Sequence, residues 1–227
     1  MDRFFTKTVY NNGDIITEVI LDIYAKYNDK YQNILFIRTP TTGNWLDKLL
    51  IDNTNITRVL YETNKIKKYT FHPSTQIVDY TKLPQLLSSM NKRFDLICID
   101  TFHEYTNSRN DLQLMSSFLS SNGIMICHDC FPLSKNMAQP FYKSGDWCGE
   151  TYAAFIDFAY RNPDFFYALL KIDTGIGIIS KIPLEMVKNN FNRQKQEIFL
   201  SYKANNNEQI YDYFVENCED MMNIISK

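Results

Sequence analysis

Two short segments of the chain bring together side chains that can do acid–base or metal chemistry. Asp100, His103 and Glu104 follow one apolar run, and His128 and Asp129 end another. A histidine near its usual pKa can take a proton from a hydroxyl, and neighbouring carboxylates can orient the ring or hold a cation. Oxygen ligands suit Mg²⁺ or Ca²⁺, and an added imidazole also admits Mn²⁺ or Zn²⁺. Asp100, His128 and Asp129 are therefore candidate metal ligands, unless Asp129 is only a turn cap and His128 an interior histidine.

Five apolar runs at fairly even spacing predict the strands that would position these groups. They are NILFIR from Asn33, TRVLYE from Thr57, TQIVDY from Thr75, FDLICID from Phe94 and GIMICHD from Gly123. Nearly continuous apolar runs are typical of parallel strands covered on both faces. Helical spacing at 15–27, 45–51, 83–90 and 104–119 alternates with them. The pattern predicts an α/β fold with a doubly wound, mostly parallel, Rossmann-like sheet.

The pattern changes after Asp129. A helix is expected from Glu150 to Tyr160, and the segment DFFYALLKIDTGIGIIS, with turn residues at 173–175, predicts an antiparallel hairpin at one sheet edge. The tail from Pro183 is polar and Asn-rich, with a last helix predicted at 208–225. We therefore expect one domain at 1–182, including the opening helix, and a helical extension of the same domain at 183–227.

The carboxyl ends of the strands carry candidate ligand-binding residues, because open parallel sheets bind ligands at that edge. Glu62 follows the first strand by the distance at which an acid accepts hydrogen bonds from ribose hydroxyls, although it can equally be a helix N-terminal charge. Asp79 can contact an adenine amino group or cap the next helix. A loop with Tyr142, Lys143, Asp146 and Trp147 can form a lid, or Trp147 can simply pack.

Composition excludes several classes of function. The formal net charge of -2 provides no basic surface for nucleic acid. Five cysteines without regular spacing are a poor disulfide framework and predict a reducing compartment. The sequence contains neither a signal peptide nor an apolar stretch long enough to span a membrane, so we expect a cytoplasmic protein without membrane partners. A homodimer is left open, because aromatic residues fill protein cores as readily as interfaces.

Four segments in this order resemble a known family: FDLICIDTFHEYTNSRNDL, SSNGIMICHDCFP, GDWCGETYAAF and KIDTGIGIIS. They are similar to the small class I S-adenosylmethionine-dependent methyltransferases related to macrocin O-methyltransferase and cephalosporin-hydroxylase-like proteins. That family is often encoded near polysaccharide or natural-product genes. The resemblance extends from about Asn33 to Lys181.

The resemblance implies S-adenosylmethionine as cofactor, with Mg²⁺ or another divalent cation as a second one. The implied reaction is methylation of a hydroxyl on a sugar or related small metabolite. By the same resemblance, His103 is a candidate general base, Asp100 and Asp129 belong to a metal or acceptor site, and His128 is a neighbouring ligand or an orienting group. The cofactor-binding residues would be Arg38, Pro40, Glu62, Asp79 and Asp100, and the catalytic ones His103, His128 and Asp129.

The segment after the first strand departs from the family. It reads IRTPTTGNW, where the fold normally has a glycine-rich turn, and Pro40 restricts the backbone. Thr101 and Phe102 also stand where the family favours glycine. These departures motivate a second hypothesis, a non-catalytic protein of the same fold that binds a glycan precursor or a protein partner. A metal-dependent hydrolase using the same acids and histidines is a third.

Overall fold

The computed structural model describes residues 32–40, 55–61, 74–143, 146–183 and 191–225. The strands are β1 (Asn33–Arg38), β2 (Asn55–Tyr61), β3 (Thr75–Val78), β4 (Phe94–Asp100), β5 (Leu119–Cys127), β6 (Phe166–Leu170), β7 (Ile176–Ser180) and β8 (Ile224–Ile225). The helices are the 3-10 helix η4 (Tyr80–Lys82), α2 (Leu83–Ser89), α3 (Tyr105–Phe118), α4 (Thr151–Arg161), α5 (Arg193–Ala204) and α6 (Ile210–Met221).

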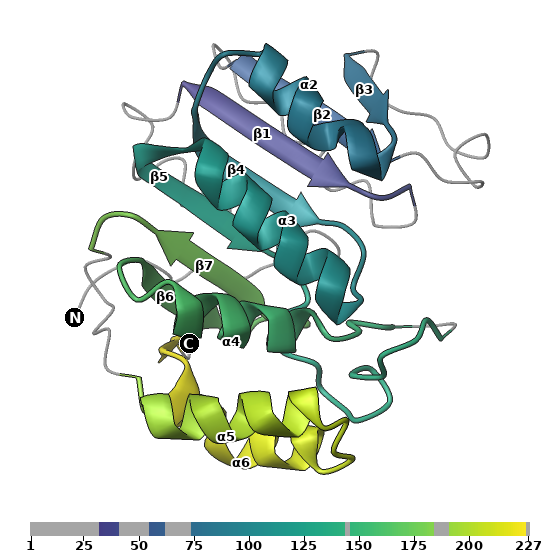
Figure 1. Cartoon of the computed structure of the whole chain (residues 1–227), viewed down its shortest axis with the longest axis vertical. Helices are drawn as coiled ribbons and strands as arrows, with labels where there is room; N and C mark the ends of the chain where they lie inside the picture. Colours follow the sequence, from purple (N-terminus) through teal and green to yellow (C-terminus); the bar gives the residue numbers. More distant parts are fainter. Residues whose placement is uncertain (1–31, 41–54, 62–73, 144–145, 184–190, 226–227) are drawn as a thin grey trace.

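The strands form one mixed sheet in the order β3-β2-β1-β4-β5-β7-β6-β8 (Figure 1). Strands β1 to β5 run parallel, while β7 is antiparallel to both β5 and β6. The predicted α/β fold and its antiparallel edge hairpin are therefore confirmed. The two-residue strand β8 then pairs with the outer side of β6.

The central strands are buried. The side chains from Ile34 to Arg38 are all at most 3% exposed, as expected for strands covered on both faces. Figure 1 shows α2, α3 and α4 across one face of the sheet, with the pair α5 and α6 beyond α4. Phe199 of α5 and Phe214 of α6 are fully buried in the same apolar core as the sheet.

The carboxyl-terminal helices differ from the prediction in two ways. Helix α5 was not expected, because its buried face consists of only Gln196 and Phe199 and leaves a weak apolar pattern. The last helix ends at Met221 rather than at residue 225. The chain is extended from Met222. Asn223 then makes two hydrogen bonds to β6. Its carbonyl accepts from the Leu169 amide, and its side-chain amide donates to the Tyr167 carbonyl. These bonds hold the segment as a strand instead of a further turn of helix.

Some sequence predictions lie outside the described residues, namely the helices at 15–27 and 45–51.

The five cysteines are buried free thiols. Within the part of the chain that the structure describes, none of the helices has the length and apolar character needed to cross a membrane.

Candidate active site

The strand order reverses between β1 and β4, and candidate residues gather at the carboxyl ends of these strands. Arg38 stands opposite Asp100 in the β1–β4 register, and the Thr39 amide donates to the Asp100 carbonyl at 3.2 Å. On the other side of β4, the His128 amide donates to the Ile99 carbonyl at 3.1 Å. The ends of three neighbouring strands are thereby locked together. This is the crevice in which open α/β sheets bind their ligands.

Two carboxylates and an imidazole converge at this point. Nε2 of His103 lies 3.4 Å from Oδ1 of Asp100 and 3.2 Å from Oδ2 of Asp129. One ligand atom from each of the three side chains falls within 4.8 Å of the others. His128 adjoins the same carboxylates, with Nδ1 3.4 Å from Oδ2 of Asp129 and 3.8 Å from Oδ1 of Asp100. Asp100, His103, His128 and Asp129 are called the acid–imidazole cluster below.

The backbone of the following loop fixes the ring of His103. Its Nδ1 lies 2.9 Å from the carbonyl oxygen of Trp147, and a carbonyl can only accept, so Nδ1 carries the hydrogen. Nε2 is then the ring atom that faces the two acids. The indole of Trp147 also packs near the imidazole, with ring centroids 5.3 Å apart. A histidine held in this way through one nitrogen presents the other to a metal or a reacting proton.

The turn between β6 and β7 supplies two supporting groups. Oδ2 of Asp173 lies 3.2 Å from Nε2 of His128, and the Thr174 hydroxyl donates to Oδ1 of Asp129 at 2.6 Å. The sequence marked 173–175 only as a turn. The motif alone could not reveal these contacts, because they depend on β7 pairing with β5 beside the cluster.

The cluster shifts the pKa values of its own members. Burial by itself raises the pKa of Asp100 and of Asp129, but the histidines outweigh it and both pKa values are lowered. Burial likewise lowers the pKa of His103 and of His128, while the neighbouring carboxylates outweigh it and raise both, that of His128 strongly. The charged forms therefore stabilise each other. A cluster of this kind is electrostatically prepared for positive charge between the carboxylates.

Thr101 and Phe102 fill space next to the cluster. The Thr101 hydroxyl donates to Oδ2 of Asp111 at 2.5 Å, and the Tyr61 hydroxyl donates to Oδ1 of the same carboxylate at 2.7 Å. Burial raises the pKa of Asp111 to about 6, although both hydrogen bonds oppose that shift. The ring of Phe102 stacks on that of Tyr61 with centroids 5.4 Å apart. The two side chains that stand here in place of glycine are therefore accommodated, Thr101 by a hydrogen bond and Phe102 by stacking.

The predicted cofactor-binding residues are only partly placed near the cluster. Arg38 is buried at the end of β1 and Pro40 follows in the same loop. Glu62 lies outside the described residues. Asp79 caps η4, because its Oδ1 accepts from the amide and the hydroxyl of Thr81, and these bonds lower its pKa. Capping, the second interpretation of Asp79, is what the structure shows, and a contact with adenine stays a prediction.

A cavity of about 460 Å³ opens in front of the cluster, within the usual range of small-molecule sites. The predicted lid residues Tyr142, Asp146 and Trp147 line it, together with Asp173 and Thr174. Its remaining lining residues are Thr39, Asp100, Thr101, Phe102, His103, His128, Asp129, Leu133 and Met137. The cavity therefore extends from the end of β1 to the loop that holds His103.

Comparisons with known proteins find one matching family and several solved structures of similar fold. Residues 22–130 match the model of a family described as a methyltransferase domain. A comparison with curated proteins gives no match. The solved structure of cofactor-bound Rv0187 from MTB is 12% identical, with a TM-score of 0.50 over 75% of this chain and 82% of that chain.

Two further solved structures are similar. A putative caffeoyl-CoA O-methyltransferase from Staphylococcus aureus is 15% identical, with a TM-score of 0.49 over 77% of this chain and 86% of that chain. The SAH-bound methyltransferase PaMTH1 from Podospora anserina is 19% identical, with a TM-score of 0.46 over 71% and 76%. Residues 22–130 are thus similar to a methyltransferase domain, and the strand order of the sheet agrees with the doubly wound fold expected of one.

Proposed function

We propose that the protein is an S-adenosylmethionine-dependent O-methyltransferase that acts on a sugar or another small hydroxylated metabolite with the help of a divalent cation. The match of residues 22–130 to a methyltransferase domain supports the cofactor. The proposals of a hydroxyl acceptor and of a cation rest on one observation. Nε2 of His103 and the carboxylates of Asp100 and Asp129 converge in an open cavity.

The donor set fits a divalent cation such as Mg²⁺ or Mn²⁺. Carboxylate oxygens are the preferred ligands of Mg²⁺, and an imidazole extends the choice to Mn²⁺. The geometry favours Asp100, His103 and Asp129 as the set, because their ligand atoms lie within 4.8 Å of one another. His128, which the sequence suggested as a ligand, is held on its far nitrogen by Asp173 and turns Nδ1 toward the same carboxylates, so it can add a ligand or orient Asp129.

The chain's own residues would position the reactants. When bound, S-adenosylmethionine supplies the methyl group and a divalent cation makes a nearby hydroxyl more acidic. Thr39 and Thr101 line the part of the cavity at the β1–β4 crevice, where the cofactor would sit. The loop with Trp147 holds His103 and closes the acceptor side. Much of the acceleration would come from orienting the hydroxyl toward the methyl carbon.

One observation favours the second hypothesis, a non-catalytic protein of this fold. Phe102 and Tyr61 form a stacked aromatic pair at the ends of β4 and β2, where a glycine would leave room for a ligand. Such a protein would bind its glycan or protein partner without recognising S-adenosylmethionine. Cofactor binding therefore separates the two hypotheses.

The deciding experiment is calorimetric titration with S-adenosylmethionine and S-adenosylhomocysteine, with and without Mg²⁺ or Mn²⁺. We expect micromolar binding of S-adenosylhomocysteine, weakened in Glu62→Ala. Absence of binding under every metal condition would reject the methyltransferase and leave the non-catalytic protein.

The cation is tested separately by the paramagnetic relaxation of water protons in the presence of Mn²⁺. Asp129→Asn should weaken Mn²⁺ binding about tenfold or more, because it removes a charged ligand and even the loss of an outer-shell partner costs about tenfold. The matched control is Asp146→Asn, which removes an exposed carboxylate of the same cavity outside the cluster. Equal loss in both variants would mean that the cavity merely attracts cations through its overall charge.

A further inference from the structure

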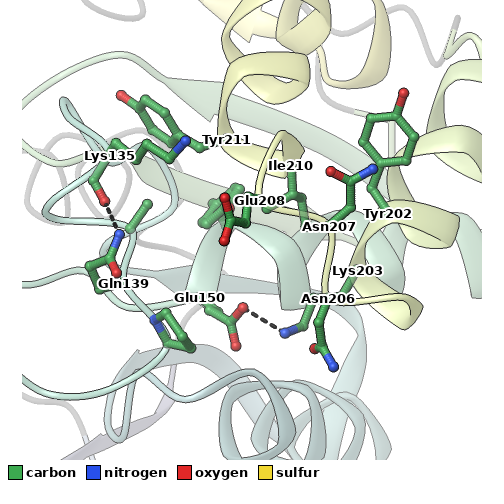
Figure 2. A pocket seen from close by; sticks show the side chains of 13 residues that line it. Lys135, Gln139, Glu150, Tyr202, Lys203, Asn206, Asn207, Glu208, Ile210 and Tyr211 are labelled. Atoms are coloured by element: carbon green, nitrogen blue, oxygen red, sulfur yellow. Dashed lines mark hydrogen bonds and ion pairs between the residues drawn. The ribbon is translucent and has the colours of Figure 1, made fainter.

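A second cavity lies on the other side of the loop that joins β5 to α4, called the active-site loop below, between that loop and the pair α5 and α6. Its volume is about 320 Å³, at the lower end of the range for small-molecule sites. It shares none of its lining residues with the active-site cavity. Figure 2 shows Gln139 and Glu150 on the loop side, with Tyr211, Glu208 and Asn207 on the helical side.

The loop forms a wall between the two cavities. The Met137 carbonyl accepts from the amides of Cys148 and Gly149, both at 3.0 Å, which closes the loop on itself. Trp147 lines the active-site cavity, and its indole nitrogen donates at 2.7 Å to the carbonyl of Gln139, which lines the second one. A ligand in the second cavity thus contacts the same loop that holds His103.

The lysines that line the second cavity already have carboxylate partners. Its lining contains two lysines, Lys135 and Lys203, and two glutamates, Glu150 and Glu208. The ammonium of Lys203 lies 2.5 Å from Oε1 of Glu150, and that of Lys135 lies 3.5 Å from Asp212. Because both cations already face carboxylates, a phosphate or carboxylate ligand would gain little here. The cavity therefore suits a neutral ligand.

The uncharged lining groups match a polyhydroxylated ring. The amides of Gln139, Asn206 and Asn207 can donate and accept hydrogen bonds, as sugar hydroxyls require. Tyr202 and Tyr211 add aromatic surface with a polar tip, which can cover the apolar face of a sugar ring. Amides, aromatic rings and the carboxylate of Glu208, which can accept hydrogen bonds from hydroxyls, together indicate a carbohydrate.

We propose that the cavity between the active-site loop and helices α5 and α6 binds a neutral hexose-type ring, as a site distinct from the acid–imidazole cluster. This inference goes beyond the proposed function, because binding at the cavity requires no methyl transfer.

The test is saturation-transfer NMR of the full chain with methyl β-D-glucopyranoside, methyl β-D-galactopyranoside and methyl α-L-rhamnopyranoside. At least one glycoside should bind with millimolar affinity. Glu208→Ala and Gln139→Ala should each weaken it about fivefold, the loss expected for one hydrogen bond. The matched control Glu216→Ala removes an exposed glutamate elsewhere on α6 and should leave binding unchanged.

Two further measurements complete the test. Asp129→Asn should still bind the glycoside, so a loss in that variant would place the sugar in the active site and overturn the proposal. Displacement of the glycoside by inorganic phosphate would also overturn it, since that identifies an anion site. The proposal fails as well if no glycoside binds, or if the lining variants behave like Glu216→Ala. None of these outcomes depends on whether S-adenosylmethionine binds.

Discussion

Gly149 packs directly against the backbone of His103. A Cβ atom at Gly149 would lie 2.3 Å from the carbonyl oxygen of His103, and the glycine has a φ of +58°, which side-chain-bearing residues rarely adopt. The next amide, that of Glu150, donates to the same carbonyl at 2.7 Å. The segment after Trp147 therefore holds the backbone of His103, while the Trp147 carbonyl holds its ring.

Gly149→Ala should consequently damage the cluster as well as the fold. We expect a loss of roughly 1–3 kcal/mol in the free energy of unfolding from the positive φ and the close contact. Mn²⁺ affinity should fall about tenfold because His103 is displaced. Asn91→Ala is the control, since Asn91 is an exposed residue with a φ of 47° away from the cluster. It should lose stability while keeping its Mn²⁺ affinity, and a parallel loss of affinity there would show that instability alone is responsible.

Thr174 is expected to act through Asp129. Its hydroxyl donates to Oδ1 of Asp129, which leaves Oδ2 to face His103. Thr174→Val keeps the shape and removes the donor, so the carboxylate should lose its orientation and Mn²⁺ should bind about tenfold more weakly. Thr174→Ser should restore binding because it restores the hydroxyl. If the serine variant is as weak as the valine variant, packing of the methyl group and not the hydrogen bond positions Asp129.

The positions of the strands, and the proximity of Asp100 to Asp129, could be predicted from the sequence. The runs NILFIR and FDLICID correspond to β1 and β4 residue for residue. Because β4 and β5 are neighbours, Asp100 and Asp129 had to end at the same edge of the sheet. Apolar periodicity is a strong signal in strands buried on both faces, so this part of the site followed from the pattern.

The groups that orient the side chains of the acid–imidazole cluster could not be predicted in the same way. His103 is oriented by the carbonyl of Trp147, 44 residues further on, and a backbone group leaves no mark in the sequence. Asp173 and Thr174 have the composition of an ordinary turn, and only the β5–β7 pairing brings that turn to His128. Residue type therefore identified the reactive groups, whereas their orientation depended on long-range pairing.

Asp111 should make stability depend on pH between about 4 and 6. Its pKa in the folded protein is about 6, above the usual 3.8, so the folded state binds the proton more tightly than the unfolded chain. Stability is then highest below the unfolded pKa and is lost as pH rises through the folded one. At about 1.36 kcal/mol per pKa unit, the loss is on the order of 3 kcal/mol.

Asp111→Asn should abolish that slope. Asparagine can still accept from the Tyr61 hydroxyl, and the Thr101 hydroxyl can accept from its amide, so both hydrogen bonds have partners. Urea unfolding at several pH values between 4 and 7 should show the wild type losing stability relative to the variant as pH rises. The pKa values of Asp100 and Asp129 are lowered, so their contributions change below this window. A constant difference across the window would contradict the raised pKa of Asp111.

Phe214 tests whether the tail beyond residue 182 belongs to the same cooperative unit as the sheet. Its fully buried ring lies 4.7 Å from that of Tyr152 in α4 and 5.5 Å from that of Phe131, measured between centroids. Phe214→Ala should lower the free energy of unfolding by roughly 3–5 kcal/mol, and Val215→Ala, at the neighbouring exposed position, should change it little. If the tail is an extension of one domain, far-UV dichroism and near-UV dichroism should report one coincident transition in both variants. An early partial transition in Phe214→Ala, with the sheet unfolding later at its wild-type denaturant concentration, would instead make α5 and α6 a separately folding unit.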